Sequence, residues 1–253
     1  ASVSIRFYAA LFPQKKTLFH AWCAWRQYLN FTTVYLDRIA FQPNKTIDIT
    51  EAGWEHLTTC LANKTGAIIL MSHLGNWELA AHLMKQKEEK IRLLLYMGKR
   101  AKEQIESQQK KDLSESGVRI IAVNEAGGSP FDILEGVRFL QSGGIVSMTG
   151  DRLWYPEQRF IEAFFLNRRI RLPETPHLMA MLAQAPLLIF FPYRTGKNSY
   201  HLTLSPPLTV PKAPRGKRQA IIAQSAQHYA NQLEAALRKN PYQWYHFEPF
   251  LEP

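Results

Sequence analysis

The chain is 253 residues long, which is enough for one large α/β domain with a substantial core or for two small domains. Its net charge of +10 favours anionic large partners, such as a phospholipid surface, nucleic acid or an acidic protein. The two cysteines are too few for a disulfide framework and show no zinc-ligand spacing, and neither a signal peptide nor an apolar stretch of membrane-spanning length is visible.

Residues 1–41 are predicted to be helical, with a break at Pro13. An apolar stripe recurs there at three- and four-residue steps, and such a stripe usually faces the core of a protein. The alternative is an interfacial segment in the headgroup region of a membrane, for which tryptophans and nearby cations are suited. We therefore expect an N-terminal helical segment over 1–41, followed by a second unit over 42–253. The stripe consists of Leu18, Trp22, Trp25, Leu29 and Leu36.

The rest of the chain alternates between short apolar runs and segments of helical spacing. This order predicts an α/β fold in a single domain, with a central, largely parallel mixed sheet that is covered by helices. We expect strands near residues 47–49, 66–71, 91–97, 118–123, 145–148, 187–193 and 200–204, and helices over 51–61, just after 76, and over 99–116, 133–140, 178–182 and 217–238.

The most informative stretch lies at residues 72–78, between a predicted buried strand and a predicted helix. His73 leaves the end of the strand, Asn76 is a good helix N-cap, and Glu78 lies in the first helical turn, where the helix dipole keeps a carboxylate ionised. A carboxylate within reach of an imidazole can fix its tautomer and stabilise its protonated form, which is the equipment of a general base. The alternative is an ordinary loop histidine beside a helix-start glutamate.

A second polar pair, Asp151 and Arg152, directly follows the strand at 145–148. If both strands are parallel, this pair lies at the same sheet edge as His73, where α/β proteins bind ligands. Arg152 could hold a phosphate or a carboxylate, with Asp151 orienting it. The alternative is a structural Asp–Arg turn.

A group of arginines, which includes Arg169 and Arg171, crowds beside the aromatic pair at residues 164–165. Arginines next to aromatic residues suit an amphiphile with an apolar tail and an anionic head. An ordinary solvated loop would have the same composition.

Other chemistries are less well supported by the sequence. His73, Glu78 and His82 could ligate a metal, but the histidine spacing does not match HExxH, and we expect no metal. The sequence contains no GxSxG, GxxxxGK[ST] or GxGxxG motif. A serine hydrolase of the elbow type, a P-loop NTPase and a Rossmann dehydrogenase are therefore disfavoured.

Taken in order, these motifs resemble the lysophospholipid acyltransferase superfamily and, within it, the bacterial lipid A biosynthesis acyltransferases, which are lauroyl and myristoyl transferases. Residues 73–78 fit the His-x4-Asp/Glu box of the family, and the resemblance runs from about Ile47 to the end of the chain. It implies an acyltransferase-like αβ sandwich, with 42–253 as the acyltransferase domain. The other matching blocks are residues 144–152, 164–173, 183–186 and 241–247.

The resemblance implies transfer of a fatty acyl group from an acyl thioester to a hydroxyl group. His73 would take the proton of the acceptor hydroxyl, and Glu78 would hold the imidazole. Arg152 would anchor the acceptor or steady negative charge on the carbonyl oxygen, and a thioester requires neither a covalent enzyme nucleophile nor a cofactor. The further residues expected to bind substrate are Asn76, Asp151, Arg169 and Arg171.

The implied partners are an acyl carrier protein or coenzyme A thioester, a lipid or glycolipid acceptor and an anionic membrane surface, with no nucleic acid. We expect the protein at the cytoplasmic face of the bacterial inner membrane, either peripheral or anchored by a segment outside this chain. The alternatives are a non-catalytic basic protein that binds lipid or nucleic acid and a metal-dependent hydrolase.

Overall fold

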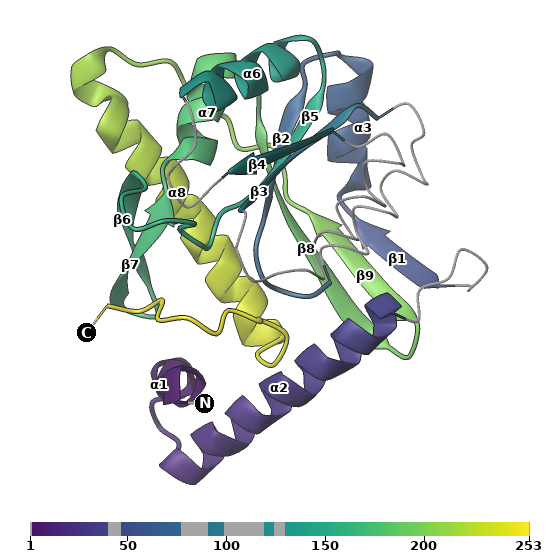
Figure 1. Ribbon diagram of the computed structural model, residues 1–253, viewed down its shortest axis with the longest axis vertical. Coiled ribbons are helices and arrows are strands. Elements are labelled where there is room, and N and C mark those ends of the chain that lie inside the picture. The colour runs from purple at the N-terminus through teal and green to yellow at the C-terminus, as the bar shows by residue number, and fades with distance from the viewer. Residues whose placement is uncertain (1, 40–46, 77–90, 99–118, 124–129, 253) are drawn as a thin grey trace.

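The computed structural model describes residues 2–39, 47–76, 91–98, 119–123 and 130–252 (Figure 1). A seven-stranded sheet in the order β1-β9-β8-β2-β5-β3-β4 forms its centre, and every pairing except that of β8 with β9 is parallel. The predicted α/β class and largely parallel mixed sheet are therefore confirmed. The strands are β1 (Asp48–Ala52), β2 (Ala67–Met71), β3 (Leu93–Gly98), β4 (Arg119–Val123), β5 (Ile145–Thr149), β8 (Leu187–Gly196) and β9 (Ser199–Leu204).

Side chains alternate between the two faces of this sheet, and helices cover both. Ile68 and Leu70 of β2 point into one core, whereas Ile69 points into the other. The first core includes residues of the long α8, and the second is closed by α3. Of the predicted helices, those after 76 and over 99–116 lie outside the described residues. The described helices are α1 (Ser2–Leu11), α2 (Thr17–Ile39), α3 (Trp54–Ala62), α6 (Pro130–Gln141), α7 (Thr175–Ala183) and α8 (Arg215–Lys239).

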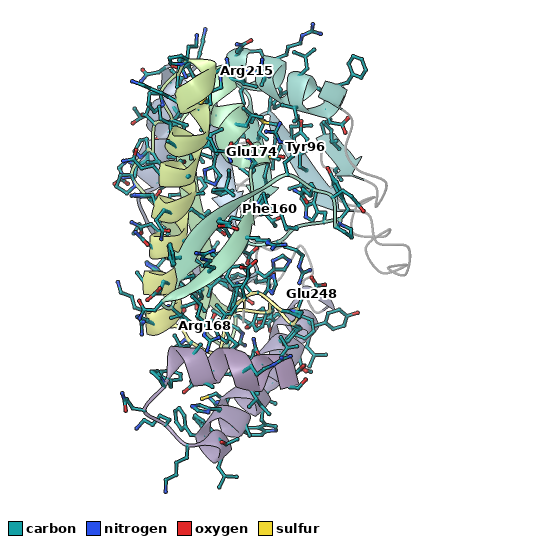
Figure 2. All side chains as sticks on the ribbon, turned by 90° about the vertical axis from the view of Figure 1, so that its left-hand side faces the viewer. Tyr96, Phe160, Arg168, Glu174, Arg215 and Glu248 are labelled. Atoms are coloured by element: carbon teal, nitrogen blue, oxygen red, sulfur yellow. The ribbon has the colours of Figure 1, made fainter. Side chains whose placement is uncertain are left out.

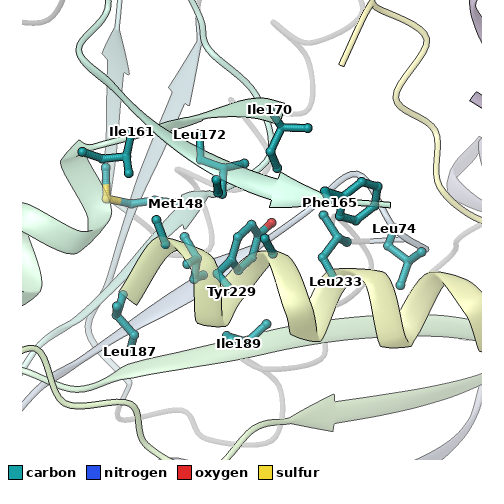
Figure 3. Packing of buried hydrophobic residues seen from close by; sticks show 14 of the residues in the cluster. Leu74, Met148, Ile161, Phe165, Ile170, Leu172, Leu187, Ile189, Tyr229 and Leu233 are labelled. Carbon is teal, nitrogen blue, oxygen red and sulfur yellow. The ribbon is translucent and has the colours of Figure 1, made fainter. Parts of the chain in front are cut away.

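A small antiparallel hairpin packs on α8 apart from the main sheet. Its strands are β6 (Phe160–Phe165) and β7 (Arg168–Pro173), joined by Leu166 and Asn167. Both linking residues have positive φ, 51° and 60°, which is the conformation of a two-residue type I′ turn. Figure 3 shows the apolar face of this hairpin on the same core as Tyr229 and Leu233 of α8. Of the two interpretations of this region, the solvated loop is therefore excluded, and binding of an amphiphile stays a prediction.

The N-terminal helices α1 and α2 lie together at one end of the molecule (Figures 1 and 2). The helices themselves agree with the prediction, but the apolar stripe of α2 does not face the core. Leu18 is 85% exposed, Trp25 is 56% exposed and Leu36 is 57% exposed. The opposite face, which includes Cys23 and Gln27, is the buried one. Contact of residues 1–41 with a membrane and their separation from 42–253 stay predictions.

Residues 241–252 follow α8 and are called the C-terminal segment below. The segment runs between α2 and the carboxyl end of the central strands, and its Leu251 and Glu252 approach α1 and β7 (Figure 1). Tyr8 of α1 donates a hydrogen bond to the carbonyl of Pro241 over 2.8 Å. Among the helices that the structure describes, none has both the length and the apolar composition to cross a bilayer.

Candidate active site

His73 lies two residues beyond the end of β2, in a loop that is fixed on both sides. The amide of Gly75 donates to the carbonyl of Gln243 over 2.8 Å, and the amide of Tyr245 donates to the carbonyl of His73 over 2.7 Å. Gly75 has a φ of +75°, and a Cβ atom there would lie 1.7 Å from the carbonyl oxygen of Pro192. Only glycine can therefore occupy this position without displacing the loop.

The His73 side chain contacts Asp151, two residues beyond the end of β5. Because β2 and β5 are adjacent parallel strands, with Met71 opposite Thr149, their carboxyl ends bring the two residues together. The Nδ1 atom of His73 lies 2.8 Å from Oδ1 of Asp151. The backbone amide of His73 donates to Oδ2 over 2.8 Å. One carboxylate thus fixes both the main chain and the ring of His73.

A third donor completes the surroundings of the carboxylate. The indole Nε1 of Trp244 donates to Oδ2 of Asp151 over 2.8 Å, and the Asp151 side chain is fully buried. Burial by itself would raise the pKa of Asp151, but the attraction of His73 and the hydrogen bonds from its ring and amide outweigh burial and lower that pKa well below its usual range. Asp151 is therefore ionised at neutral pH.

This contact determines which ring nitrogen of His73 can act as a base. When Nδ1 carries the proton that it donates to Asp151, the lone pair that can accept a proton is on Nε2. The buried carboxylate also stabilises the imidazolium that forms after proton uptake. His73 is 19% exposed, so the ring is partly accessible from outside.

The C-terminal segment also brings a second imidazole to the site. The His246 ring stacks on Trp244 at a centroid distance of 5.0 Å and meets the His73 ring edge-on at 5.6 Å. Burial lowers the pKa of His246 to about 4, so this ring is neutral at physiological pH. Its Nδ1 atom lies 3.3 Å from the carbonyl of Glu248. His246 therefore forms an uncharged wall beside His73.

The structure brings only some of the predicted binding residues to this place. Arg152 follows Asp151 directly, and its Nε atom lies 3.6 Å from a carboxylate oxygen of Glu248. The buried amide side chain of Asn76 lies 3.4 Å from the hydroxyl of Tyr200. That hydroxyl donates in turn to Asp37 of α2 over 2.7 Å. The helix that Asn76 would cap lies outside the described residues.

Arg169 and Arg171 lie on the exposed side of β7. The guanidinium of Arg171 forms an ion pair with Glu252 over 2.7 Å and lies over the ring of Phe160. The carbonyl of Arg169 accepts a hydrogen bond from the amide of Glu252. These contacts tie the hairpin to the C-terminal segment, and none of them reaches His73. Substrate binding by either arginine stays a prediction.

Two candidate residues from the sequence, Glu78 and His82, lie outside the described residues. The predicted contact between Glu78 and the imidazole therefore stays a prediction, and so does the weaker metal hypothesis. Within the part of the chain that the structure describes, no group of three or more histidine, cysteine, aspartate or glutamate side chains is arranged to hold a metal ion.

The sequence correctly predicted that Asp151 lies at the same sheet edge as His73, but it predicted that Asp151 orients Arg152 rather than contacts His73. It predicted no role for Trp244 or His246. For Asp151, the signal was its position after a strand parallel to β2. For the other two, the signal was the match of 241–247 to the C-terminal block of the family, which locates the residues without saying what they contact.

A largely apolar cavity of about 310 Å³ lies beside β5. Met148 and Thr149 contribute to its wall just before Asp151, and Trp154 and Leu178 close it from the following loop and from α7. The hydroxyl of Tyr96, in the second half of β3, donates to the backbone carbonyl of Asp132, and both residues line the cavity. The cavity thus begins within two residues of the carboxylate that holds His73.

Comparison with known proteins agrees with this geometry. A family model described as bacterial lipid A biosynthesis acyltransferase matches residues 24–251. The chain is also similar to phosphatidylinositol mannoside acyltransferases of Mycobacterium tuberculosis strains H37Rv and CDC 1551, each 25% identical over 165 residues, which is 65% of this chain. That alignment covers 49% of each relative, so the match spans about half the length of these curated proteins. Because the family model takes in β2, β5 and the C-terminal segment, the chain belongs to the bacterial lipid A biosynthesis acyltransferase family.

Proposed function

We propose that this protein transfers a fatty acyl group from an acyl thioester to a hydroxyl group of a lipid or glycolipid acceptor. The observation that carries the proposal is the contact of the His73 ring with the buried Asp151 carboxylate, 2.8 Å apart at the carboxyl ends of two adjacent parallel strands. Membership of the acyltransferase family supports the reaction class. The phosphatidylinositol mannoside named in the curated relatives supports a glycolipid acceptor.

In the proposed reaction, Nε2 of His73 takes the proton of the acceptor hydroxyl as its oxygen attacks the thioester carbonyl carbon. The tetrahedral intermediate collapses, the C–S bond breaks, and the proton on the imidazolium passes to the departing thiolate. The products are an ester and a free thiol. Asp151 remains ionised throughout and acts as a positioning residue, because its low pKa keeps it from taking the proton.

A role for Glu78, the carboxylate of the family's His-x4-Asp/Glu box, is also proposed, and it has a test of its own. The resemblance gives Glu78 the role of holding the imidazole, whereas the described contact of Nδ1 is with Asp151. Replacement of Glu78 by glutamine changes neither His73 nor Asp151, the two residues that make this contact. A loss of turnover in Glu78→Gln as large as that in His73→Ala would give Glu78 a role of its own in the reaction.

The cavity beside β5 is proposed to take the acyl chain. Its apolar wall suits a hydrocarbon, and Thr149 in that wall is two residues before Asp151, which puts the cavity on the side of β5 that leads to the His73 site. Arg152, next to Asp151, is proposed to steady the anionic head of a substrate or the charge on the carbonyl oxygen.

The donor is proposed to be an acyl carrier protein or coenzyme A thioester, and the site of action is proposed to be the cytoplasmic face of the inner membrane. The net charge of +10 suits both an acidic carrier protein and an anionic lipid surface. The reaction requires no metal or redox cofactor.

The decisive experiment is incubation of the protein with acyl carrier protein thioesters and total bacterial lipid extract, followed by mass spectrometry of the lipids. We expect a new acylated lipid together with stoichiometric free thiol, and we expect both to vanish in a folded His73→Ala variant. Undiminished turnover in His73→Ala would refute the role of His73. Loss of activity on chelation would favour the metal-dependent hydrolase instead.

A further inference from the structure

The helix α2 exposes a row of large apolar side chains and buries polar ones on its other side, which is unlike an ordinary surface helix. Leu18, Trp25 and Leu36 share one face, because they are spaced by whole numbers of turns, and each is more than half exposed. On the opposite face Cys23 and the polar Gln27 are buried. Scattered exposed apolar residues are common, but a row of five of them on one side of a helix, over five turns, indicates a surface that another apolar phase covers.

The charge around this stripe indicates what covers it. Residues 2–39 contain five lysines and arginines and a single acidic residue, Asp37, so their net charge is +4. Asp37 is engaged by Arg194 and by the hydroxyl of Tyr200, both over 2.7 Å. Lys15 and Lys16 are exposed at the start of α2 beside Leu18. Apolar side chains, tryptophans and flanking cations together match an anionic bilayer surface, in which a helix lies parallel to the membrane plane.

The stripe is long enough to act as a docking face. It extends from Leu18 to Leu36, and 18 residues of α-helix span about 27 Å. Trp22 and Trp25 lie in its N-terminal half, and indole rings prefer the headgroup level of a bilayer. Figure 2 shows α1 and α2 at one end of the molecule, beyond Glu248 of the C-terminal segment, so the outer side of α2 faces away from the domain.

The inner side of α2 is bonded to the segment that holds the catalytic pair. The side chain of Gln27 donates to the carbonyl of Trp244, and Asn30 donates to the carbonyl of Tyr242 over 3.2 Å. The indole of that same Trp244 donates to Asp151. Asp151 is therefore separated from the exposed stripe by one tryptophan and the width of one helix, which is about 10 Å.

We propose that α2 is an in-plane docking helix that places the outer stripe from Leu18 to Leu36 in the headgroup region of an anionic phospholipid bilayer. Docking in this way would hold His73 just above the lipid headgroups, one tryptophan and one helix width from the stripe. The docking itself is independent of the proposed reaction. Its consequence rests on that function: an acceptor hydroxyl would react in place at the membrane surface, without extraction of the lipid into the protein.

The test compares two variants that carry the same chemical change on different helices. Leu29→Gln/Leu36→Gln removes two side chains of the stripe that are 44% and 57% exposed. Leu134→Gln/Leu182→Gln changes two leucines of α6 and α7 that are 44% and 41% exposed. Glutamine has a helix propensity close to that of leucine, and exposed leucines add little to the core, so both variants are expected to fold.

Binding is measured by co-sedimentation with vesicles of phosphatidylethanolamine containing about one-third phosphatidylglycerol, without donor or acceptor. We expect the wild-type protein and the α6/α7 variant to bind equally, and the partition coefficient of the stripe variant to fall roughly tenfold or more. Failure of the wild type to bind, or equal binding by the two variants, would overturn the proposal. The proposal would also be overturned if raised salt abolished binding while the leucine changes left it unaltered, because a purely electrostatic surface behaves in that way.

Two further measurements separate the remaining outcomes. Light scattering without lipid detects self-association, and a dimer that Leu29→Gln/Leu36→Gln dissociates would show that the stripe binds a second copy of the chain instead of a membrane. Thiol release with a short, water-soluble alcohol as acceptor reports the chemistry alone. We expect the stripe variant to keep this activity and to lose turnover on acceptor lipid in vesicles. If the wild type showed neither activity, the proposed function would be contradicted. The docking proposal would then be judged by the sedimentation experiment alone.

Discussion

The backbone amide and the ring of His73 both contact a single carboxylate, that of Asp151, at 2.8 Å each. The main-chain bond fixes where the loop leaves β2, and the ring bond fixes the direction and the tautomer of the imidazole. Trp244 bonds to the same carboxylate and so makes the arrangement dependent on the C-terminal segment. Loop position and ring orientation are therefore coupled through one side chain.

Asp151→Asn tests this coupling. An amide presents a single acceptor oxygen, whereas the His73 amide, the His73 ring and the Trp244 indole all need one. We expect kcat for thiol release to fall by about a thousandfold with a KM near that of the wild type, because the imidazolium loses its stabilising charge while substrate contacts persist. The kcat and KM of the purified variant check this, with circular dichroism as the folding control. A rise in KM alone would instead place Asp151 in substrate binding.

Gly75→Ala is expected to destabilise the protein by about 3 kcal/mol or more, because the added Cβ would lie 1.7 Å from the carbonyl oxygen of Pro192 and the φ of +75° disfavours any L side chain. Urea unfolding gives the change in free energy of unfolding. Gly216→Ala, in the first turn of α8 with no atom within 4 Å of its added Cβ, is the matched control. The control is expected to be neutral or stabilising by up to about 1 kcal/mol. Equal stability of the two variants would contradict the contact at Pro192.

His246 is expected to act through its shape rather than through proton transfer, because burial lowers its pKa to about 4 and the ring is uncharged at neutral pH. His246→Phe keeps a ring against Trp244 and should retain turnover within a few-fold of the wild type at pH 7.5. His246→Ala leaves a cavity beside His73 and should lower both turnover and stability, the latter by about 3 kcal/mol. If the phenylalanine and alanine variants were equally inactive, the imidazole itself would be required.

His177 is expected to make the protein sensitive to acid. Burial lowers its pKa from 6.5 to about 3, so between these pH values the unfolded chain binds a proton that the folded protein does not. Its contribution to stability is complete above pH 6.5 and is lost as the pH falls toward 3, by about 2 kcal/mol at pH 5. His177→Leu/Ser225→Ala removes this histidine together with its hydrogen-bond partner, 2.7 Å away.

The free energy of unfolding of this double variant, measured by urea titration at pH 7.5 and pH 5, should change less with pH than that of the wild type. Some pH dependence will persist, since the buried His246 titrates in the same direction. An identical pH dependence in both proteins would contradict the burial of a neutral His177.

Leu178→Trp tests the assignment of the cavity beside β5 to the acyl chain. Leu178 lines this cavity, and a larger side chain there should shorten the longest acyl thioester that is used efficiently. Leu182→Trp, one turn further along α7, lies outside the cavity lining and serves as the control. Competition among thioesters of graded length, analysed by mass spectrometry, reports the preference. An unchanged length profile in Leu178→Trp would remove the cavity from the donor site.

The sequence predicted the middle of the central sheet well because β2, β5 and the first half of β8 are nearly uninterrupted apolar runs. All five residues of β2 are buried, and such a run has few alternatives in an α/β protein. The predicted strands were also sufficient to place residues 73 and 151 at one edge of the sheet. The direct contact between them could not be read, because it depends on the pairing of β2 with β5, and strand order is not encoded in either strand alone.

Two further differences have separate physical reasons. The buried residues Ile161, Ala163 and Phe165 alternate with exposed ones, and this period of two indicates a strand at β6. The strand was not predicted, because the region was interpreted from its arginine and aromatic content rather than from its periodicity. For α2, the spacing from Leu18 to Leu36 shows correctly that these residues share a face. Spacing carries no information on whether a face is covered, and here the covered face is the one with Gln27.

The bond between Trp244 and Asp151 joins residues 93 positions apart. During synthesis, His73 and Asp151 therefore leave the ribosome well before the indole that completes their surroundings. A nascent chain that ends before residue 244 has a base and a carboxylate without the third donor, and without the backbone bonds that fix the loop. We therefore expect competence to activate an alcohol to arise only once residues 243–245 are in place, late in translation.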